Sequence, residues 1–397
     1  MKVLMFGWEF PPFNTGGLGT ACYGITKGLS NKGVDVIFVL PNAPQGAKGE
    51  HVKLVVADKS VKIKRINSPI SAYMTNEEYL KIKTNKDKGS QYGQDLFLEV
   101  QRYAALAGEI AKEEEFDVIH AHDWLTYLAG LEAKKVSGKP LVVHMHATEF
   151  DRTGGNGVNQ YVYDIERKGM HEADIVIPVS NYTKNMIMKH YGVPENKIHV
   201  VHNAVEFTNY DGGSVSGLND HSKIVLFLGR ITLQKGPDYF IDAARKVLDI
   251  YPDVKFIVAG SGDMEPAMIE KAASLGMCEH VLFAGFLRGE DIDRAYKMAD
   301  VYVMPSVSEP FGITPLEAMR NGTPVIISKQ SGVSEVITHC IKIDFWDINQ
   351  MADKILGVLR FKELHGEMSD MGGREVMKFN WDIPAEKCVD VYNKVVR

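Results

Sequence analysis

Short apolar runs recur along the chain, and each is followed by turn residues and then by a stretch with helical spacing. The first two runs are Val3–Phe6 and Val34–Leu40, with a helix expected over Ala21–Lys32 between them. Such runs suit strands that are buried on both faces, and their alternation with helices is typical of parallel β-α-β units. The pattern therefore predicts an α/β fold built on parallel sheets.

The same alternation continues on both sides of one interruption. Gly, Ser, Asp and Asn dominate Asn209–His221, which predicts a linker between two domains. We expect an N-terminal domain over residues 1–208, a C-terminal domain over 222–378 and an amphipathic helix within 379–397. Further strands are expected at Val52–Ala57, Val118–Ala121, Leu141–His144, Ile175–Val179 and Ile198–His202, and after the linker at Ile224–Leu228, Phe256–Ala259, Val281–Ala284, Val301–Met304 and Val325–Ser328.

The composition is that of an ordinary globular protein, with 45% of the 397 residues hydrophobic and 24% charged. The net charge of -6 argues against a general nucleic-acid-binding protein, so no nucleic-acid partner is expected. Residues 1–210 contain equal numbers of basic and acidic residues, and the acidic excess therefore lies in the C-terminal half.

Cysteine usage and hydropathy bear on the cellular compartment. The cysteines at 22, 278, 340 and 388 are far apart and form no C-x-x-C pair, which indicates free thiols in a reducing compartment. Glu9 interrupts the N-terminal apolar run, and no stretch approaches the roughly 20 apolar residues of a membrane span. A cytoplasmic protein is expected.

Residues 59–88 differ from the rest of the N-terminal half, because they hold eight Lys or Arg against three acidic residues, with Tyr73 and Tyr79 between them. One interpretation is a solvated surface excursion. The other is a patch that faces an acceptor or an anionic surface. This segment offers the only route to membrane contact that the sequence suggests, and such contact is not the expected one.

A glycine-rich loop, Pro11–Gly19, follows the first strand and opens a helix, so that the backbone N–H groups of Gly16 and Gly17 can point at an anion. The loop is not a G-x-G-x-x-G motif, because Cys22 stands where the third glycine belongs, and no P-loop motif is present. A dinucleotide-dependent oxidoreductase is therefore disfavoured. A ligand loop and a structural turn both remain open.

Two histidine pairs come at the ends of strands: His120 and His122, followed by Asp123, and then His144 and His146. The carboxyl ends of parallel strands line the ligand crevice in open α/β sheets. H-x-H spacing puts both imidazoles of a pair on one face, where they could bind a metal ion. A catalytic metal would also need carboxylates from later strands, so we expect a polar crevice wall with one functional histidine and no metal.

Two cations in the C-terminal half suggest a phosphate-binding site. Arg230 ends a strand, and Lys235 follows at an expected helix start. Cations at a strand end suit a diphosphate, and exposed loop charges are the alternative.

The stretch Glu309–Glu317 carries two carboxylates around a second helix start. Thr314 and Glu317 have the spacing of a capping box, with proline in the first turn. The same helix N-terminus, preceded by Gly312, could present N–H groups to phosphate, and the carboxylates could hold sugar hydroxyls. By contrast, Asp291-Ile-Asp293 looks like a D-x-D metal motif but opens an amphipathic helix, where acidic residues favour the helix dipole.

Together these motifs resemble the GT-B glycosyltransferases of family 4 and are similar to those of glycogen and starch synthases. The resemblance covers essentially the whole chain and implies two Rossmann-like domains that face each other across a cleft, with the C-terminal helix returning to the N-terminal domain. It rests on Gly229-Arg230, Lys235-Gly236, Ala259-Gly-Ser-Gly262, the E-x7-E pair Glu309 and Glu317, Trp8-Glu-Phe-Pro-Pro, Thr15-Gly-Gly-Leu-Gly19 and Val118-Ile-His-Ala-His-Asp-Trp124.

The resemblance also implies roles for individual residues. Arg230 and Lys235 would bind the donor pyrophosphate, and Glu309 would bind the transferred sugar. His146 would contact the donor sugar, and Asp123 the sugar or the acceptor. Further donor contacts are implied for the ribose at Glu317, for phosphates and sugar at the amides of Gly16, Gly17, Gly312, Ile313 and Thr314, and for the base at the backbone of Phe286 and Leu287.

The implied reaction transfers a hexosyl unit, with glucosyl expected, from UDP-glucose or ADP-glucose to a carbohydrate acceptor, with retention of configuration and without metal or cofactor. Asn14, Phe311 and Glu317 depart from the bacterial glycogen synthase pattern, which argues against that ADP-glucose enzyme. The alternatives are transfer to a lipid or small-molecule acceptor, a GT-B-fold nucleotide-sugar epimerase, and a silent nucleotide-sugar sensor. The sequence indicates no oligomeric state.

Overall fold

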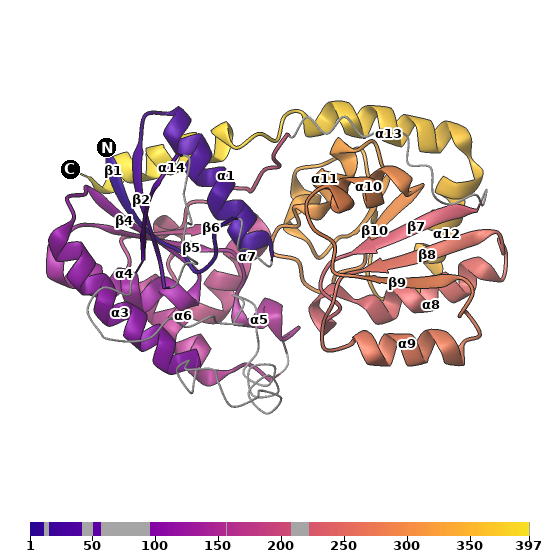
Figure 1. Ribbon diagram of the computed structural model, residues 1–397, viewed down its shortest axis with the longest axis horizontal. Coiled ribbons are helices and arrows are strands. Elements are labelled where there is room, and N and C mark those ends of the chain that lie inside the picture. Colours follow the sequence, from indigo (N-terminus) through magenta and orange to yellow (C-terminus); the bar gives the residue numbers. More distant parts are fainter. Residues whose placement is uncertain (12–15, 42–50, 57–95, 156, 208–221, 397) are drawn as a thin grey trace. The chain divides into compact units, whose positions relative to one another are not determined.

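The computed structural model describes residues 1–11, 16–41, 51–56, 96–155, 157–207 and 222–396 (Figure 1). The chain forms two compact units. Unit 1 comprises Met1–Phe150, Gly157–Ala204 and Trp381–Arg397, and unit 2 comprises Asp151–Asn156 and Val205–Asn380. Each unit contains a parallel six-stranded sheet with helices on its faces, so the predicted two-domain α/β fold is confirmed.

The sheet of unit 1 has the strand order β3-β2-β1-β4-β5-β6, so the chain starts in the middle and builds outward in both directions. Four successive residues of β1 are completely buried, as the apolar run predicts for a strand covered on both faces. The strands are β1 (Lys2–Phe6), β2 (Asp35–Leu40), β3 (Lys53–Val56), β4 (Val118–His122), β5 (Leu141–Met145) and β6 (Ile175–Pro178).

Helices cover both faces of this sheet because crossovers that run toward opposite edges place their helices on opposite sides. Figure 1 shows α1 and α14 on one face and α3, α4 and α6 on the other. The α-helices of this part of the chain, with the C-terminal one, are α1 (Gly17–Asn31), α3 (Leu96–Glu113), α4 (Trp124–Ser137), α5 (Glu149–Arg152), α6 (Gln160–Glu172), α7 (Asn181–Met186) and α14 (Asp382–Val395), and a π-helical turn (Ile187–Tyr191) and a short 3₁₀ helix (Glu195–Lys197) follow α7.

The strand expected at Ile198–His202 is not formed, and this prediction was wrong. The segment runs beside β6 but makes one isolated bridge, from Val176 to Ile198. The N–H of Val201 still donates to the carbonyl of Pro178 (3.0 Å). Because Pro178 has no N–H to donate in return, the ladder cannot be completed at that point.

The C-terminal helix α14 packs on α1 in unit 1, as predicted. A side-chain carbon added at Gly24 would lie 2.1 Å from the Trp381 ring, and one at Gly28 would lie 2.5 Å from the Trp381 carbonyl oxygen. Both glycines are therefore required by the close approach of the two helices. At the rim, Asn31 donates to Asp382 (3.0 Å).

The sheet of unit 2 has the order β12-β11-β10-β7-β8-β9. All strands expected after the linker are present, and β12 is an addition that the sequence did not predict. The strands are β7 (Lys223–Leu228), β8 (Val254–Ala259), β9 (Val281–Gly285), β10 (Val301–Met304), β11 (Val325–Ser328) and β12 (Ile341–Ile343).

Alternate residues of the unit 2 strands face two different helical layers. Val225 and Phe256 pack into an apolar core with α8 and α12, whereas the ring of Tyr302 lies edge-on to Tyr296 of α10. The helices of unit 2 are a 3₁₀ helix (Leu233–Lys235), α8 (Pro237–Leu248), α9 (Glu265–Ser274), α10 (Glu290–Met298), α11 (Thr314–Arg320), a 3₁₀ helix (Gly332–Glu335), α12 (Ile348–Arg360) and α13 (Lys362–Val376).

The glycines of the Ala259–Gly262 motif are required by neighbouring backbone. Gly260 has φ +140, and a side-chain carbon there would lie 1.8 Å from the Gly229 carbonyl oxygen. One at Gly262 would lie 2.2 Å from the Ile231 carbonyl oxygen. These glycines thus allow the end of β8 to pass close to the loop after β7, which holds that loop in place.

Two expected features are outside the described residues, namely the basic segment 59–88 and the linker Asn209–His221. Asp151–Asn156 belongs to unit 2 although unit 1 surrounds it in sequence, and the predicted domain 1–208 did not separate it. Within unit 2, Ser308 donates to Asp151 (2.6 Å).

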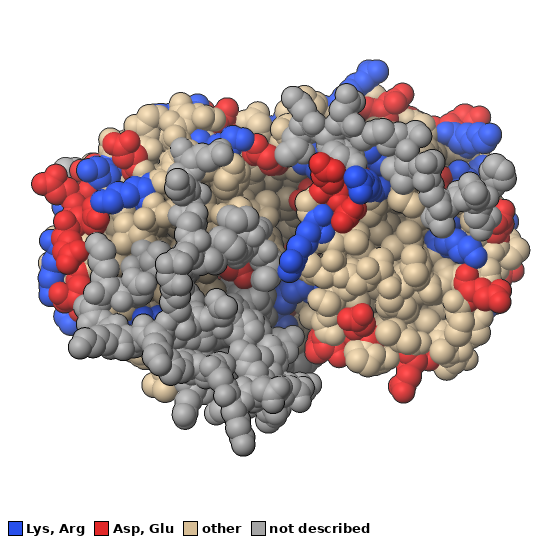
Figure 2. All heavy atoms as spheres, in the orientation of Figure 1, with Lys and Arg blue, Asp and Glu red and all other residues tan. Residues whose placement is uncertain are grey.

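On the face of unit 2 seen in Figure 2, both acidic and basic side chains occur, separated by uncharged surface. The acidic excess of the C-terminal half therefore forms no single patch on that face. Among the helices that the structure describes, none combines the length and the apolar character that crossing a membrane requires.

Candidate functional site

The predicted site residues of unit 1 lie at the carboxyl ends of β1, β4 and β5, which are neighbours in the sheet. Those of unit 2 follow β7, β9 and β10. In open parallel sheets this is the edge at which ligands bind.

Asp123 joins the ends of β4 and β5. Its carboxylate Oδ1 accepts hydrogen bonds from the backbone N–H groups of His146 (2.6 Å) and Ala147 (3.3 Å), and its own N–H donates to the carbonyl of His144 (2.9 Å). Asp123 has φ +59, and within the described residues it alone among non-glycine residues has a positive φ. Such backbone strain is held only where surrounding contacts fix it, and it is frequent at functional sites.

His146 is held by a second histidine. Its Nε2 atom lies 2.9 Å from Nδ1 of His122, so one ring nitrogen donates a hydrogen bond to the other. Burial lowers the pKa of His146 to about 3. The imidazole is therefore neutral at physiological pH and serves as a hydrogen-bonding group rather than a cation.

The two histidine pairs form one cluster. The parallel register places His122 directly beside His144, and the ring centroids of His144 and His146 are 4.3 Å apart. The sequence predicted a polar wall from these four residues, and the structure brings them together on one face of the sheet. It also adds Tyr392 of α14, whose hydroxyl lies 2.6 Å from Nδ1 of His120.

The N-terminus of α1 is open. Gly16 precedes the helix in an extended conformation and gives no side-chain cap, and the first turn has no acidic residue. A side-chain carbon added at Gly17 would meet nothing within 4 Å, so the local protein packing does not require this glycine. N–H groups in the first turn of a helix, beside a glycine of this kind, can bind an anion. Residues 12–15 of the loop are outside the described part of the chain.

In unit 2, the side chains of Arg230 and Lys235 each contact a neighbouring polar side chain. Nη2 of Arg230 donates to Gln234 (2.9 Å), and Nζ of Lys235 forms an ion pair with Glu309. Sequence reasoning had singled out Lys235 and Glu309 separately. Gln234 was missed, although its position four residues after Arg230 was a usable signal.

Glu309 is a nearly buried carboxylate, with 6% of its surface exposed. Besides Lys235, it accepts a hydrogen bond from the Ser306 hydroxyl (3.2 Å). Its backbone is fixed on both sides, because its N–H donates to Gln330 (2.9 Å) and its carbonyl accepts from Gly332 (2.9 Å). The carboxylate is therefore held rigidly at the end of the sheet.

The predicted capping box is not formed. Thr314 is already helical, Ile313 takes the cap position, and no side chain caps the helix. Thr314 instead accepts a hydrogen bond from the Tyr302 hydroxyl (2.9 Å), and Glu317 accepts one from Tyr296 (3.2 Å). The prediction was wrong because the Thr314 and Glu317 side chains bond to tyrosines of β10 and α10 instead of to the helix backbone.

Burial raises the pKa of Glu317, while Arg320 and the Tyr296 hydrogen bond act in the opposite direction. Immediately before α11, Gly312 has φ +100, and a side-chain carbon there would lie 3.2 Å from Cγ of Glu309. A larger residue at Gly312 would therefore displace the carboxylate or strain the backbone.

Phe286 and Leu287 follow β9, at the edge of the sheet, whereas Glu309 and Glu317 follow β10. The strands β7 and β8 lie between these two groups, so Arg230 stands between the candidate base-binding and sugar-binding positions. Phe286 is 47% exposed, with the Arg288 guanidinium 5.2 Å from its ring centre.

Asp293, of the rejected D-x-D motif, has structural partners. It forms an ion pair with Arg320 and accepts a hydrogen bond from Asn321 (2.8 Å). Asp291 pairs with Arg294 one turn later on the same helix. These contacts agree with the structural interpretation of the motif.

Comparison with known proteins gives a consistent result for both units. Residues 214–372 match the family model "Glycosyl transferases group 1", and residues 90–208 match "Glycosyltransferase Family 4". The chain is 32% identical to an uncharacterized glycosyltransferase of Methanocaldococcus jannaschii, over 99% of this chain and 98% of the relative.

More distant similarity extends to proteins with specific names. The chain is 26% identical to the glycogen synthase of Mycobacterium tuberculosis, over 85% of this chain and 80% of the relative. Among solved structures, Anabaena HepE in complex with UDP and glucose matches with a TM-score of 0.72 at 18% identity, over 99% of this chain and 100% of that one. At that identity the structural match shows a shared fold.

Proposed function

The chain belongs to family 4 of the glycosyltransferases, and from this premise we propose that it transfers a hexosyl unit, most simply glucosyl, from a nucleoside-diphosphate sugar to a carbohydrate acceptor of the α-glucan type, with retention of configuration. UDP-glucose and ADP-glucose are the proposed donors. The similarity to a glycogen synthase and the fold shared with a UDP- and glucose-binding protein support this choice.

The observation that carries the proposal is the ion pair of the buried Glu309 with the half-buried Lys235, five residues after Arg230. Burying a carboxylate and an ammonium together is expensive unless both are well bonded, and Ser306 supplies a further bond to Glu309. Stability gives no evident reason to keep these charges at a strand end. A donor does, since it presents a diphosphate for the cations and sugar hydroxyls for the carboxylate.

In this proposal Arg230 and Lys235 bind the pyrophosphate. Arg230 can bond two phosphate oxygens at once through its planar guanidinium, and Gln234 orients it. Lys235 is shared between Glu309 and the phosphates. Together they stabilise the charge that grows on the leaving diphosphate, which is the part that a metal ion plays in other transferases. The transfer step is therefore proposed to need no metal and no cofactor.

The carboxylates and the backbone amides position the rest of the donor. Glu309 accepts hydrogen bonds from the sugar hydroxyls, and Glu317, oriented by Tyr296, accepts them from the ribose. The remaining proposed contacts are made to phosphates and sugar by the amides of Gly16, Gly17, Gly312, Ile313 and Thr314, and to the base by the backbone of Phe286 and Leu287.

Unit 1 contributes His146 and Asp123. The neutral His146 donates or accepts a hydrogen bond at a sugar hydroxyl without adding charge to the reacting centre. Asp123 fixes the backbone of His146. In this proposal its carboxylate also binds the sugar or the acceptor.

The bond changes balance without an added reagent. The bond from sugar C1 to the phosphate oxygen breaks, and its electron pair leaves with the nucleoside diphosphate. The acceptor hydroxyl oxygen forms the new bond to C1 on the same face, and its proton passes to the departing phosphate oxygen. Arg230 and Lys235 neutralise that oxygen while it accepts the proton.

The direct test is a donor panel of UDP-glucose, ADP-glucose, GDP-mannose and UDP-GlcNAc, each incubated with and without maltooligosaccharides. Release of nucleoside diphosphate that depends on the acceptor, together with lengthened oligosaccharides, is the expected result. Epimerised sugar without acceptor would contradict transfer. Release that depends on a lipid or a small molecule, but not on oligosaccharides, would correct the acceptor class.

A further inference from the structure

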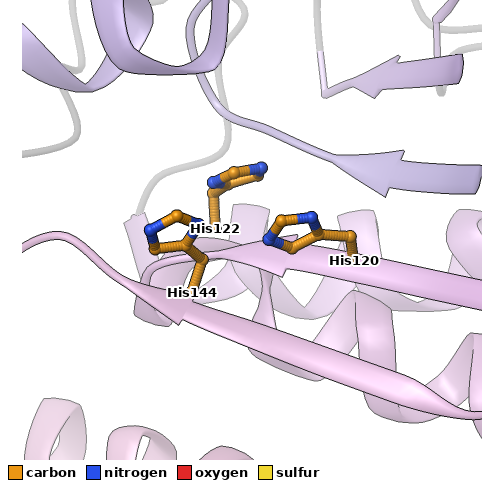
Figure 3. Close-up of side chains that lie close together, drawn as sticks. All are labelled: His120, His122 and His144. Atoms are coloured by element: carbon orange, nitrogen blue, oxygen red, sulfur yellow. The ribbon is translucent and has the colours of Figure 1, made fainter. Parts of the chain in front are cut away.

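Three histidines of unit 1 converge from two neighbouring strands. Figure 3 shows His120 and His122 of β4 beside His144 of β5. The two β4 residues share a face because they are two positions apart, and the register pairs His122 with His144. All three side chains are completely buried.

His120 and His122 each form a hydrogen bond through Nδ1, and in each ring Nε2 has no partner among the described residues. Nδ1 of His120 is bonded to the Tyr392 hydroxyl (2.6 Å), and Nδ1 of His122 to Nε2 of His146 (2.9 Å). Within the described part of the chain, Nε2 of His120, Nε2 of His122 and both ring nitrogens of His144 are buried without a hydrogen-bond partner. Leaving a buried polar atom unsatisfied costs about 1–3 kcal/mol, so four such atoms in one place need an explanation.

The rings have the chemical state that metal binding requires. Burial lowers the pKa of His120 to about 3, and burial together with the neighbouring histidines lowers the pKa of His122 and of His144. Each imidazole is thus neutral at physiological pH and keeps a lone pair on one nitrogen. Neutral imidazole is a preferred ligand of zinc, copper, nickel and iron.

We propose that His120, His122 and His144 bind one divalent transition-metal ion of the zinc type in unit 1. The ligand atoms are Nε2 of His120, Nε2 of His122 and one ring nitrogen of His144, and candidate ligand atoms of the three residues all lie within 4.8 Å of one another. Zinc–nitrogen bonds of about 2.0–2.1 Å bring such atoms within about 3.5 Å, so the rings rotate inward on binding. A water molecule or a small anion completes the four positions.

The surrounding bonds support this assignment. A histidine that binds a metal commonly uses its other ring nitrogen to bond a neighbouring group, which fixes its tautomer and orientation. Tyr392 does this for His120, and His146 does it for His122. Both bonds leave Nε2 as the ring nitrogen without a hydrogen-bond partner among the described residues.

The ion has a structural role, because its ligands are fully buried and belong to the scaffold of unit 1. It joins β4 to β5, and through Tyr392 it also fixes α14. The sequence alone predicted no metal, and the inference departs from that expectation. It does not depend on the proposed transfer reaction, whose pyrophosphate-binding cations Arg230 and Lys235 are in unit 2. Ordered water at the same nitrogens is the competing explanation.

The test measures metal content, spectrum and stability of the full-length protein. The chain is stripped with a chelator, and Zn²⁺ or Co²⁺ is added back. About one tightly bound ion per chain, a visible absorption band of tetrahedral Co²⁺ and a higher melting temperature with Zn²⁺ are expected. Absence of stoichiometric metal and of the Co²⁺ band would leave water as the explanation and overturn the proposal.

Two variants locate the ion. His144→Phe keeps a flat ring in the stack and removes a ligand, so it should lose most of the bound metal, while His365→Phe in α13 of unit 2 should bind as the wild type does. Tyr392→Phe deletes only the hydroxyl beside His120 and should weaken Zn²⁺ binding about 10- to 100-fold. The Tyr392→Phe variant still tests the proposal if His144→Phe does not fold. Unchanged metal binding in both His144→Phe and Tyr392→Phe would place the ion elsewhere and contradict the assignment.

Discussion

Nδ1 of His122 lies 2.9 Å from Nε2 of His146, so a histidine on β4 fixes the ring of the histidine that follows β5. The Asp123 carboxylate fixes the backbone of the same residue (2.6 Å). His146 is thus held at both its backbone and its ring. In the proposed reaction, His146 contacts the sugar and His122 acts through it as a positioning residue.

Replacement of His146 should therefore reduce turnover strongly. His146→Ala is expected to lower kcat about 100-fold, since a preorganised contact to the sugar is lost. His171→Ala, a change in α6 of the same unit, should leave kcat unchanged. Adding His122→Phe to His146→Ala should lower kcat per folded protein little further, because residues that act as a unit are not additive, although the double variant also loses a proposed metal ligand and with it stability. Multiplying effects in the steady-state kinetics would show that His122 acts independently of His146.

Variants of the Lys235–Glu309 ion pair can distinguish its effect on stability from its effect on turnover. Lys235→Met leaves the buried Glu309 carboxylate without its ammonium and should destabilise unit 2 by about 3 kcal/mol, measured by urea unfolding. Adding Glu309→Gln removes the charge and should restore part of that stability, while turnover stays low. A double variant that regains turnover would contradict the proposed donor contacts.

Glu317 makes donor affinity dependent on pH. Burial raises the pKa of this carboxyl above its ordinary value of 4.5, and ribose binding uses the ionised form. Affinity should therefore decline as the pH falls through the raised pKa. Tyr296→Phe removes a hydrogen bond that lowers the pKa, so the decline should begin at a higher pH.

Glu317→Gln is the matched control for this effect. The amide oxygen can still accept the Tyr296 hydrogen bond, so stability should be close to that of the wild type, while donor binding is weaker and loses this pH dependence. Donor titrations at several pH values measure both properties. An unchanged affinity in this variant would assign Glu317 a purely structural role.

The docking of α14 can be tested at two glycines. Gly24→Ala would place its methyl group 2.1 Å from the Trp381 ring and should destabilise unit 1 by about 1–3 kcal/mol. Gly366→Ala in α13 has nothing within 4 Å and should be neutral or slightly stabilising, because alanine favours helices. Equal melting temperatures for the two variants would contradict tight packing of α1 on α14.

The sheets could be predicted because their strands are buried on both faces and therefore appear as apolar runs, as in β1. The expected strand at Ile198–His202 does not form, because Pro178 of the neighbouring strand β6 has no N–H to donate to it. Local hydrophobicity carries no information about a partner strand's donors. The addition of Asp151–Asn156 to unit 2 likewise depends on tertiary contacts such as that of Ser308 with Asp151.

The candidate site was predictable where its motifs are local. The sequence singled out Arg230, Lys235 and Glu309 one by one, and the ion pair of Lys235 with Glu309 did not follow from their spacing. The capping box failed because Tyr302 and Tyr296 reach α11 from elements 12 and 21 residues earlier. The histidine cluster depends on the register of β4 against β5, which a single sequence does not specify.

The central claim is that Arg230 stabilises a departing diphosphate during sugar transfer. The most direct measurement is the rate of nucleoside diphosphate release from UDP-glucose or ADP-glucose with maltooligosaccharide, for Arg230→Ala and for Arg294→Ala, a surface arginine of α10. Arg230→Ala should lower the rate by about 1,000-fold or more with a nearly unchanged melting temperature, and Arg294→Ala should leave the rate unchanged. Retained turnover in Arg230→Ala would contradict the account.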